Sequence, residues 1–246
     1  MDYKTIDINV DLGEGIGNEE ELMPYISSCN IACGGHAGDI DTMKSVIKLA
    51  KQYHVKIGAH PSFPDKKNFG RVKMNLSDTD LFNTIKTQVE DLILIINEEE
   101  AILHHIKLHG ALYNLAAIDN NIAHTVLKAL KSIALPVKLY VPYKSVIAQL
   151  AIENNIEIVY EAFADRMYND DLTLVSRTHK QALIYDEDKL FNHIYNMVTK
   201  QKVKTISGVE VDIIADTFCI HGDNPKAIIL IKKLKERLIS KGVKIV

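Results

Sequence analysis

Strand-like and helix-like segments alternate about seven times along the 246 residues, and this alternation is the strongest constraint on the fold. The strand-like segments occupy residues 6–12, 28–34, 55–60, 104–109, 137–141, 157–163 and 213–220. The helix-like segments occupy residues 19–25, 39–50, 77–99, 119–130, 143–153, 186–200 and 224–240. This order is typical of parallel βαβ units. We predict a single domain over residues 1–246, a closed (β/α) barrel that is seven-stranded and distorted. A doubly wound open sheet is the alternative.

Residue types at several segment ends support these boundaries. Asp39 or Asp41 is expected to cap the helix that follows, because a short acidic side chain accepts from free backbone N–H groups. Asn224 followed by Pro225 predicts the N-cap and first residue of the final helix. Residues 203–211 predict a small hairpin.

Charge and cysteine content exclude several classes of partner and location. A formal net charge of −3 gives no electrostatic basis for binding nucleic acid or an anionic membrane. No apolar run is long enough to span a bilayer, and residues 1–5 lack the pattern of a signal peptide. Three cysteines are an odd number and too few for a disulfide framework. These features predict a soluble cytoplasmic protein.

The segment 104–114 carries three ionisable side chains on one face of a strand. Side chains alternate faces with period two, so His105, Lys107 and His109 share one face, and Ile106 and Leu108 share the other. Burying His and Lys costs free energy unless they are paired or used. We predict a strand that lines a polar cavity and ends at His109. A partly hydrated edge strand is the alternative.

Acidic and imidazole side chains recur where predicted strands end. Those at a strand end are Asp11, His60, His109 and His221, and those just beyond one are His36, Asp165 and Arg166. In α/β barrels the carboxyl ends of the strands meet at one rim, where active sites are built. The pattern therefore predicts one shared site.

The residue types indicate the chemistry of this site. An imidazole titrates near neutral pH, so each of the four histidines can act as a general base. Asp11 can orient a histidine, bind a metal ion or hold a water. Lys107, Arg166 and Arg177 can bind a carboxylate or a phosphate.

Other motifs are weaker or absent. The chain has no Gly-x4-Gly-Lys-Ser/Thr loop, and the glycines of residues 13–17 have the wrong spacing for a dinucleotide site. We therefore expect no nucleotide site of the chain's own. Cys219 can be a nucleophile, but a buried small hydrophobic residue is the favoured interpretation. For Glu14 and Asp223, a turn or cap role is as consistent with the sequence as catalysis.

A set of motifs spans nearly the whole chain. They are NVDLGEG at 9–15, NIACGGHAGD at 30–39, IGAHPSFPD at 57–65, FGR at 69–71, KLHGALYN at 107–114, EAFADRMY at 161–168 and HGDNP at 221–225. In these motifs the chain resembles the LamB/YcsF family, whose members form one component of the prokaryotic ATP-dependent 5-oxoprolinase.

The resemblance implies a seven-stranded barrel similar to sugar deacetylases, and cleavage of 5-oxoproline to L-glutamate coupled to ATP hydrolysis. It also implies partner subunits B and C, with which ATP would be handled, in keeping with the missing nucleotide loop. Asn9, Asn30, Arg166 and Arg177 are expected to bind substrate. Gly35 stands where the family usually has Phe, a change expected to widen the pocket.

A five-membered lactam needs activation, because its nitrogen is a poor leaving group. Subunits B and C are expected to perform or assist phosphorylation of the amide oxygen, and this chain to direct water onto the activated ring. His60 or His109 would be the base, held by Asp11. The expected catalytic residues are Asp11, His36, His60, Lys107, His109, Asp165 and His221.

Two other functions fit the same residues. One is a metal-dependent deacetylase of an N-acylated sugar or small amide, with Asp11, His36 and His60 as candidate ligands of a divalent metal ion. The other is a non-catalytic component that holds substrate and stabilises subunits B and C.

Overall fold

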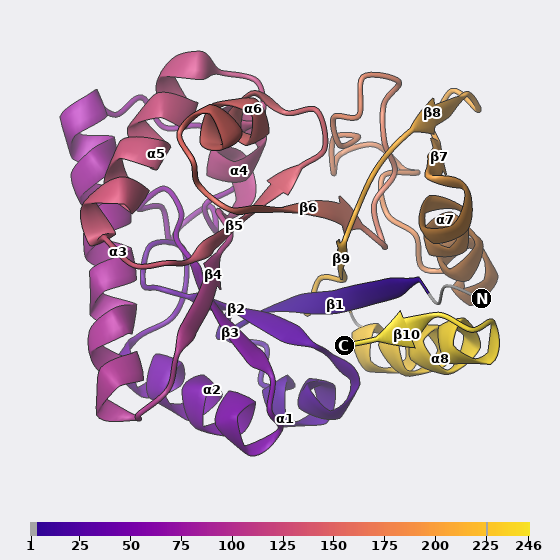
Figure 1. Ribbon diagram of the computed structural model, residues 1–246, viewed down its shortest axis with the longest axis horizontal. Coiled ribbons are helices and arrows are strands. Elements are labelled where there is room, and N and C mark those ends of the chain that lie inside the picture. Colours follow the sequence, from indigo (N-terminus) through magenta and orange to yellow (C-terminus); the bar gives the residue numbers. More distant parts are fainter. Residues whose placement is uncertain (1–3, 225) are drawn as a thin grey trace.

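A closed barrel of parallel strands forms the centre of the molecule (Figure 1). The computed structural model describes residues 4–224 and 226–246. The ring consists, in order, of β1 (Thr5–Leu12), β2 (Ser28–Ala32), β3 (Lys56–His60), β4 (Leu103–Ile106), β5 (Lys138–Pro142), β6 (Ile158–Phe163) and β9 (Thr217–Cys219). Parallel pairing of β9 with β1 closes it. The predicted seven-stranded barrel is therefore confirmed, and the open sheet is excluded.

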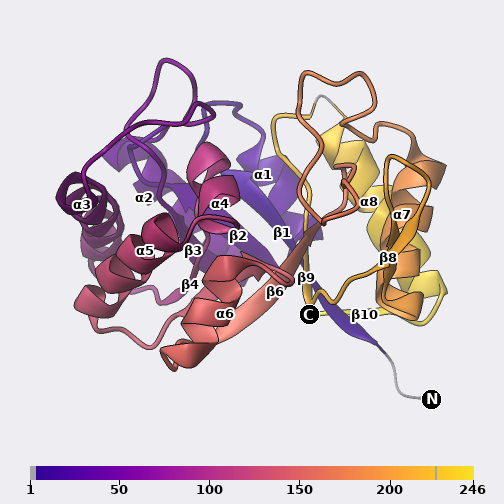
Figure 2. The same cartoon turned by 90° about the horizontal axis from the view of Figure 1, so that it is seen from above.

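Helices surround the ring on its outside (Figures 1 and 2). They are α1 (Glu19–Leu22), α2 (Ile40–Gln52), α3 (Asp78–Glu98), α4 (Gly110–Ala116), α5 (Asn120–Ile133), α6 (Val146–Glu153), α7 (Glu187–Lys200) and α8 (Ala227–Ser240). A 3₁₀ turn, Met23–Tyr25, completes the predicted segment 19–25. Asp39 caps α2 by accepting from the Thr42 N–H, which decides between the two expected caps. No helix within the described ranges is long and apolar enough to cross a membrane.

The inside of the ring is polar, although barrels are usually filled by branched apolar side chains. The Asn9 amide nitrogen donates to Glu161 at 2.9 Å and to Thr217 at 2.8 Å, and His105 Nε2 lies 2.7 Å from Asn30 Oδ1. These contacts cross between strands that are not all neighbours, so the side chains project into the ring. The alternate residues of β1, such as Ile8, join the hydrophobic core instead.

The fourth strand is shorter than predicted. β4 ends at Ile106, and a helix that the sequence analysis missed, α4, begins at Gly110. The ladder nevertheless continues beside β3, because Lys107 N–H donates to the Ala59 carbonyl and His109 N–H to the Pro61 carbonyl, each at 2.9 Å. The predicted alternation of faces therefore extends to His109.

The C-terminal part differs from prediction in three places. Of the predicted strand 213–220, only Thr217–Cys219 is a strand. The final helix begins at Ala227 rather than at Pro225, which lies outside the described residues. Asn224 stabilises the preceding turn by accepting from Lys226 N–H at 2.9 Å. The predicted hairpin is confirmed as β7 (Lys202–Lys204) and β8 (Glu210–Asp212). A short strand, β10 (Lys244–Ile245), pairs with the start of β1 and was not predicted.

Candidate active site

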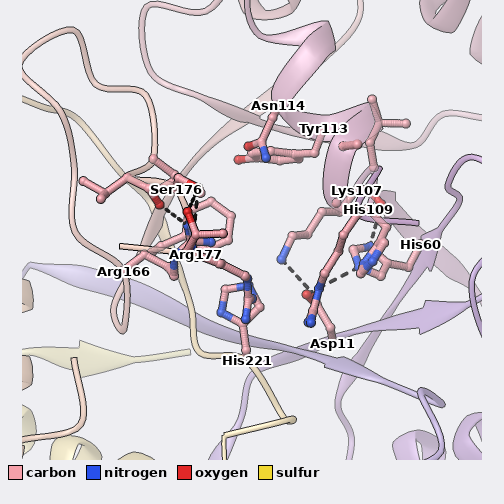
Figure 3. Close-up of a pocket in the computed structure, with 18 residues that line it drawn as sticks. Asp11, His60, Lys107, His109, Tyr113, Asn114, Arg166, Ser176, Arg177 and His221 are labelled. Carbon is pink, nitrogen blue, oxygen red and sulfur yellow. Dashed lines mark hydrogen bonds and ion pairs between the residues drawn. The ribbon is translucent and has the colours of Figure 1, made fainter. Parts of the chain in front are cut away.

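A cavity of about 370 Å³ opens at the carboxyl ends of the barrel strands. Its ionisable lining residues are Asp11, His60, Arg71, Lys107, His109, Arg166, Arg177 and His221. They come from the ends of β1, β3, β4, β6 and β9 and from the loops that follow β3 and β6. Figure 3 shows Lys107, His109 and His60 on one side of this cavity and Arg166 and Arg177 on the other. The structure thus brings together side chains that are as far apart in sequence as residues 11 and 221.

Lys107 lies between two carboxylates on the cavity floor. Its Nζ is 2.9 Å from Asp11 Oδ1, 3.0 Å from Glu161 Oε1 and 3.0 Å from Cys219 Sγ. Burial alone would lower the pKa of Lys107, but the charges of Asp11 and its other neighbours raise it well above the usual range. Burial would likewise raise the pKa of Asp11, but His60 and Lys107 hold it well below its usual value. The pair therefore stays ionised at neutral pH.

Glu161 was missed in the sequence, although a carboxylate inside the otherwise apolar segment 157–163 was a detectable signal. Asn9 and Asn30 were expected to bind substrate, but both are fully buried and neither lines the cavity. The Asn30 amide nitrogen donates to Asp11 Oδ1 and to Asn9 Oδ1, each at 2.8 Å. These two asparagines lie beneath the cavity and position Asp11, because their polar atoms are already engaged by neighbours.

Three histidines and a glutamate gather beside the floor. His60 Nδ1 lies 2.8 Å from the Lys107 carbonyl, and His109 Nε2 lies 2.9 Å from the Phe69 carbonyl. The remaining nitrogens, His60 Nε2 and His109 Nδ1, face each other at 2.9 Å. His36 stacks on His109 with ring centres 3.6 Å apart, and its Nε2 lies 3.0 Å from Glu14 Oε1. Burial lowers the pKa of His36 and, more strongly, that of His109.

His221 and Asp165 form a separate pair on the opposite side. His221 Nδ1 lies 2.9 Å from Asp165 Oδ1, and His221 N–H donates to Asp165 Oδ2 at 3.1 Å. Burial would raise the pKa of Asp165, but His221 lowers it below the usual value. The ionised carboxylate fixes a proton on Nδ1, which leaves Nε2 of His221 as an acceptor in a ring that lines the cavity.

Arginines supply positive charge to the mouth of the cavity. Arg166 is buried and donates from Nη2 to the Val175 carbonyl at 2.7 Å. Burial and the nearby Arg177 lower its pKa to about 10, so it remains charged at neutral pH. Arg71 Nη2 lies 2.5 Å from Asp223 Oδ2, and Arg177 Nη1 lies 3.8 Å from the same oxygen. Arg71 was expected only as part of a motif, and the structure adds it to the lining.

Cys219 and Gly35 have different surroundings from those that chemistry at the site would need. Burial raises the pKa of the Cys219 thiol well above its usual value, so it is a poor nucleophile. A Cβ on Gly35 would lie 2.3 Å from Gln88 Oε1 and 2.5 Å from Ser62 Oγ. Gln88 and Ser62 therefore fill the space beside Gly35, which does not line the cavity. The expected widening of the pocket is wrong.

The described residues contain two groups of side chains with the spacing of metal ligands. One is Glu14, His36, His60 and His109, and the other is Asp11, Cys219 and His221. The ligand set expected from the sequence is divided between them, because Asp11 belongs to one group and His36 and His60 to the other. Asp11 Oδ2 does lie 3.4 Å from His60 Nε2.

Comparisons with known proteins agree over almost the whole chain. The sequence model of the LamB/YcsF family matches residues 6–246. A Bacillus cereus (strain B4264) protein, named as the first of the lettered subunits of 5-oxoprolinase, is 40% identical over 248 residues, covering 98% of this chain and 98% of that protein. A protein of the same name from Campylobacter jejuni subsp. doylei is 41% identical over 245 residues, covering 98% and 96%.

A solved structure shares the fold throughout. The crystal structure of the lactam utilization protein from Thermus thermophilus superposes with a TM-score of 0.91 at 34% identity, covering 98% of both chains. Because the family match runs from residue 6 to residue 246 and both named relatives are at least 40% identical over nearly their full lengths, this chain belongs to the LamB/YcsF family.

Proposed function

We propose that this protein is the component of an ATP-dependent 5-oxoprolinase that binds 5-oxoproline and directs hydrolysis of its ring, together with partner subunits B and C. The names of the relatives at 40–41% identity support the substrate and the place in a multi-subunit enzyme. The observation that carries the catalytic part is the Asp165–His221 pair, which shares one cavity with Lys107 and Arg166.

The reaction needs an activated ring, because a lactam nitrogen leaves poorly. Transfer of the ATP γ-phosphoryl group to the amide oxygen, performed or assisted by subunits B and C, makes the ring carbon electrophilic. Water adds to this carbon, and the C–N bond breaks as the ring nitrogen takes up a proton. A second water hydrolyses the acyl phosphate that remains, giving glutamate and phosphate.

Each side of the cavity has a part in this scheme. Arg166 and Arg177 bind the substrate carboxylate and the phosphoryl group, because guanidinium groups match both. Lys107 stabilises negative charge that develops on the oxygens of the attacked carbon.

The general base differs from the expectation drawn from sequence. His60 and His109 use both ring nitrogens, one for a backbone carbonyl and one for each other. His221 has one nitrogen held by Asp165 and one free to accept a proton from water. We therefore assign the base to His221 rather than to His60 or His109.

The test is an assay of this protein and subunits B and C, separately and together, with 5-oxoproline and ATP. We expect glutamate only from the complete mixture. We expect His221→Gln to reduce its release about 10²–10⁴-fold, the usual contribution of a general base. His124→Gln, at an exposed position on α5, is the matched control and should leave the rate unchanged.

Three results would contradict the proposal. Undiminished release by His221→Gln would remove the assigned base. A variant that only needs more substrate, with an unchanged maximal rate, would indicate a component that holds substrate without catalysing its cleavage. Acetate release from N-acetylated sugars by this chain alone, without glutamate from the full mixture, would indicate a deacetylase.

A further inference from the structure

Four donor atoms from four consecutive strand ends converge beside the cavity. Glu14 follows β1, His36 follows β2, His60 ends β3 and His109 follows β4. Their donor atoms all lie within 4.8 Å of one another. The four side chains are almost fully buried, with exposures of 5%, 0%, 1% and 6% respectively. Such convergence needs an explanation, because each polar group here has lost its contact with water.

Backbone carbonyls fix the tautomers of two of these histidines. A carbonyl oxygen can only accept, so His60 carries a proton on Nδ1, toward the Lys107 carbonyl, and His109 carries one on Nε2, toward the Phe69 carbonyl. Histidines that bind metal ions commonly donate their other ring N–H to a carbonyl in this way. The arrangement therefore orients His60 Nε2 and His109 Nδ1 as unprotonated nitrogens.

These two nitrogens point their lone pairs at each other. They are 2.9 Å apart, which is a hydrogen-bond distance, but neither carries a hydrogen in the neutral state. A cation between or beside them removes the repulsion. An extra proton on one ring would also do so, but burial lowers the pKa of His109 well below its usual value.

Glu14 supplies negative charge without a cationic side chain to balance it. Its Oε1 lies 3.0 Å from His36 Nε2, 3.4 Å from His109 Nδ1 and 4.0 Å from His60 Nε2. Within residues 4–224 and 226–246, no lysine or arginine nitrogen lies within 4 Å of this carboxylate. Buried carboxylates are normally paired with a cation or bound to a metal ion.

The spacing of the four atoms suits one small ion. Tetrahedral coordination at about 2.0–2.1 Å places donor atoms about 3.3 Å apart, as follows from the bond lengths of Zn²⁺ sites. The four measured separations, 2.9, 3.0, 3.4 and 4.0 Å, surround this value. Imidazole and carboxylate donors suit Zn²⁺ and the neighbouring divalent transition metals, whereas Mg²⁺ and Ca²⁺ prefer oxygen ligands.

We infer that Glu14 Oε1, His36 Nε2, His60 Nε2 and His109 Nδ1 form a binding site for one divalent transition-metal ion. Four protein donors fill a tetrahedral shell, so the ion fastens together the carboxyl ends of β1 to β4. This site differs from the set Asp11, His36 and His60 by the exchange of Asp11 for Glu14 and His109. It does not depend on the proposed reaction, because metal binding is measured without substrate or partner subunits.

The test is a titration of the full chain with Co²⁺ after removal of metals by a chelator. We expect one Co²⁺ per chain, with the visible absorption of a tetrahedral ion, displacement by Zn²⁺ and a rise in the unfolding temperature on binding. His36→Gln and Glu14→Gln should each weaken binding by at least about 10–100-fold, the range already seen when only the partners of ligands are altered. His124→Gln is the control and should bind as the wild type does.

Two outcomes would overturn the inference. If the chelated protein binds no Co²⁺ while its circular dichroism stays that of a folded protein, the cluster is held by a shared proton only. If a thiolate-to-Co²⁺ charge-transfer band appears and is lost in Cys219→Ser, the ion occupies the second group, Asp11, Cys219 and His221, instead. Glu14→Gln keeps the shape of the side chain, so a folded variant with lost binding separates ligation from folding.

Discussion

Lys107 is the residue on which the charge balance of the barrel interior depends. It is 1% exposed and is the ammonium partner of both Asp11 and Glu161. The folded-state pKa of Asp11 is lowered, so its contribution to stability is present above about pH 3.8 and is lost as the pH falls further. The pKa of Lys107 is raised, so its contribution is present below about pH 10.5 and is lost as the pH rises beyond the folded value.

We expect Lys107→Met to lower the free energy of unfolding at pH 7.5 by about 3–5 kcal/mol, because it leaves two buried carboxylates without their cation. The loss should become smaller at pH 5, since carboxylates that lack a cation take up protons more readily in the folded state. Urea unfolding at both pH values measures this. Lys48→Met, at a lysine that is 60% exposed, is the control and should change little. A deficit that stays equal at the two pH values would contradict the ion-pair explanation.

Individual site residues were predictable where chemistry and strand ends coincide. Asp11, His60, His109 and His221 stand out because each ends a recognisable strand. The partners of these residues were not predictable, because they depend on which strands face each other across the ring. Glu161 meets Lys107 only because β6 and β4 enclose a common interior, and no local pattern in either segment indicates that distance.

At the scale of elements, α4 begins at a glycine that other residues cannot replace without strain. Gly110 has φ +55°, and a Cβ there would lie 2.6 Å from the Gly70 carbonyl oxygen. The same carbonyl accepts from Ala111 N–H at 2.9 Å, so it is fixed in place. The contact holds the loop after β3 against the first turn of α4, next to His109.

We expect Gly110→Ala to destabilise the protein by about 2–4 kcal/mol, which combines the left-handed backbone with the steric overlap. The matched control is Gly208→Ala, in the β7–β8 hairpin, where φ is +92° but nothing lies within 4 Å of the added Cβ. It should cost only the backbone part, about 1–2 kcal/mol. Thermal and urea unfolding of both variants compare the two costs, and equal losses would contradict the role given to the Gly70 carbonyl.

Elements with strong periodicity or caps were predicted well, and those defined by tertiary contacts were not. Ser77 and Asp119 cap α3 and α5 as their positions in the sequence suggest. α4 was missed because the extended segment before it continues the ladder past β4, so the change of period comes late. Ile213 and Ile214 resemble strand residues in the sequence, but they lead from the hairpin into the ring. β10 has only two residues, too few for any period to be visible.

At the scale of the whole molecule, the two faces of each strand are stabilised in different ways. Asn30 and Ile31 are adjacent on β2 and both are fully buried, but Asn30 faces the polar interior and Ile31 joins the hydrophobic core. We expect Asn30→Leu to cost about 2–5 kcal/mol, since Asn9, Asp11 and His105 each lose a hydrogen bond at similar side-chain volume. Ile31→Val should cost about 0.5–1.5 kcal/mol. Urea unfolding tests both, and an Asn30→Leu variant as stable as wild type would contradict the polar interior as a source of stability.

The hydrogen-bonded interior also restricts how the family can diverge. An oily barrel centre tolerates exchange of one alkyl group for another of similar size, one position at a time. Here each donor is matched to an acceptor on another strand, so a single exchange strands its partner without water. Mutational drift along the barrel axis must therefore proceed by concerted replacements, whereas the helical exterior is free to vary position by position.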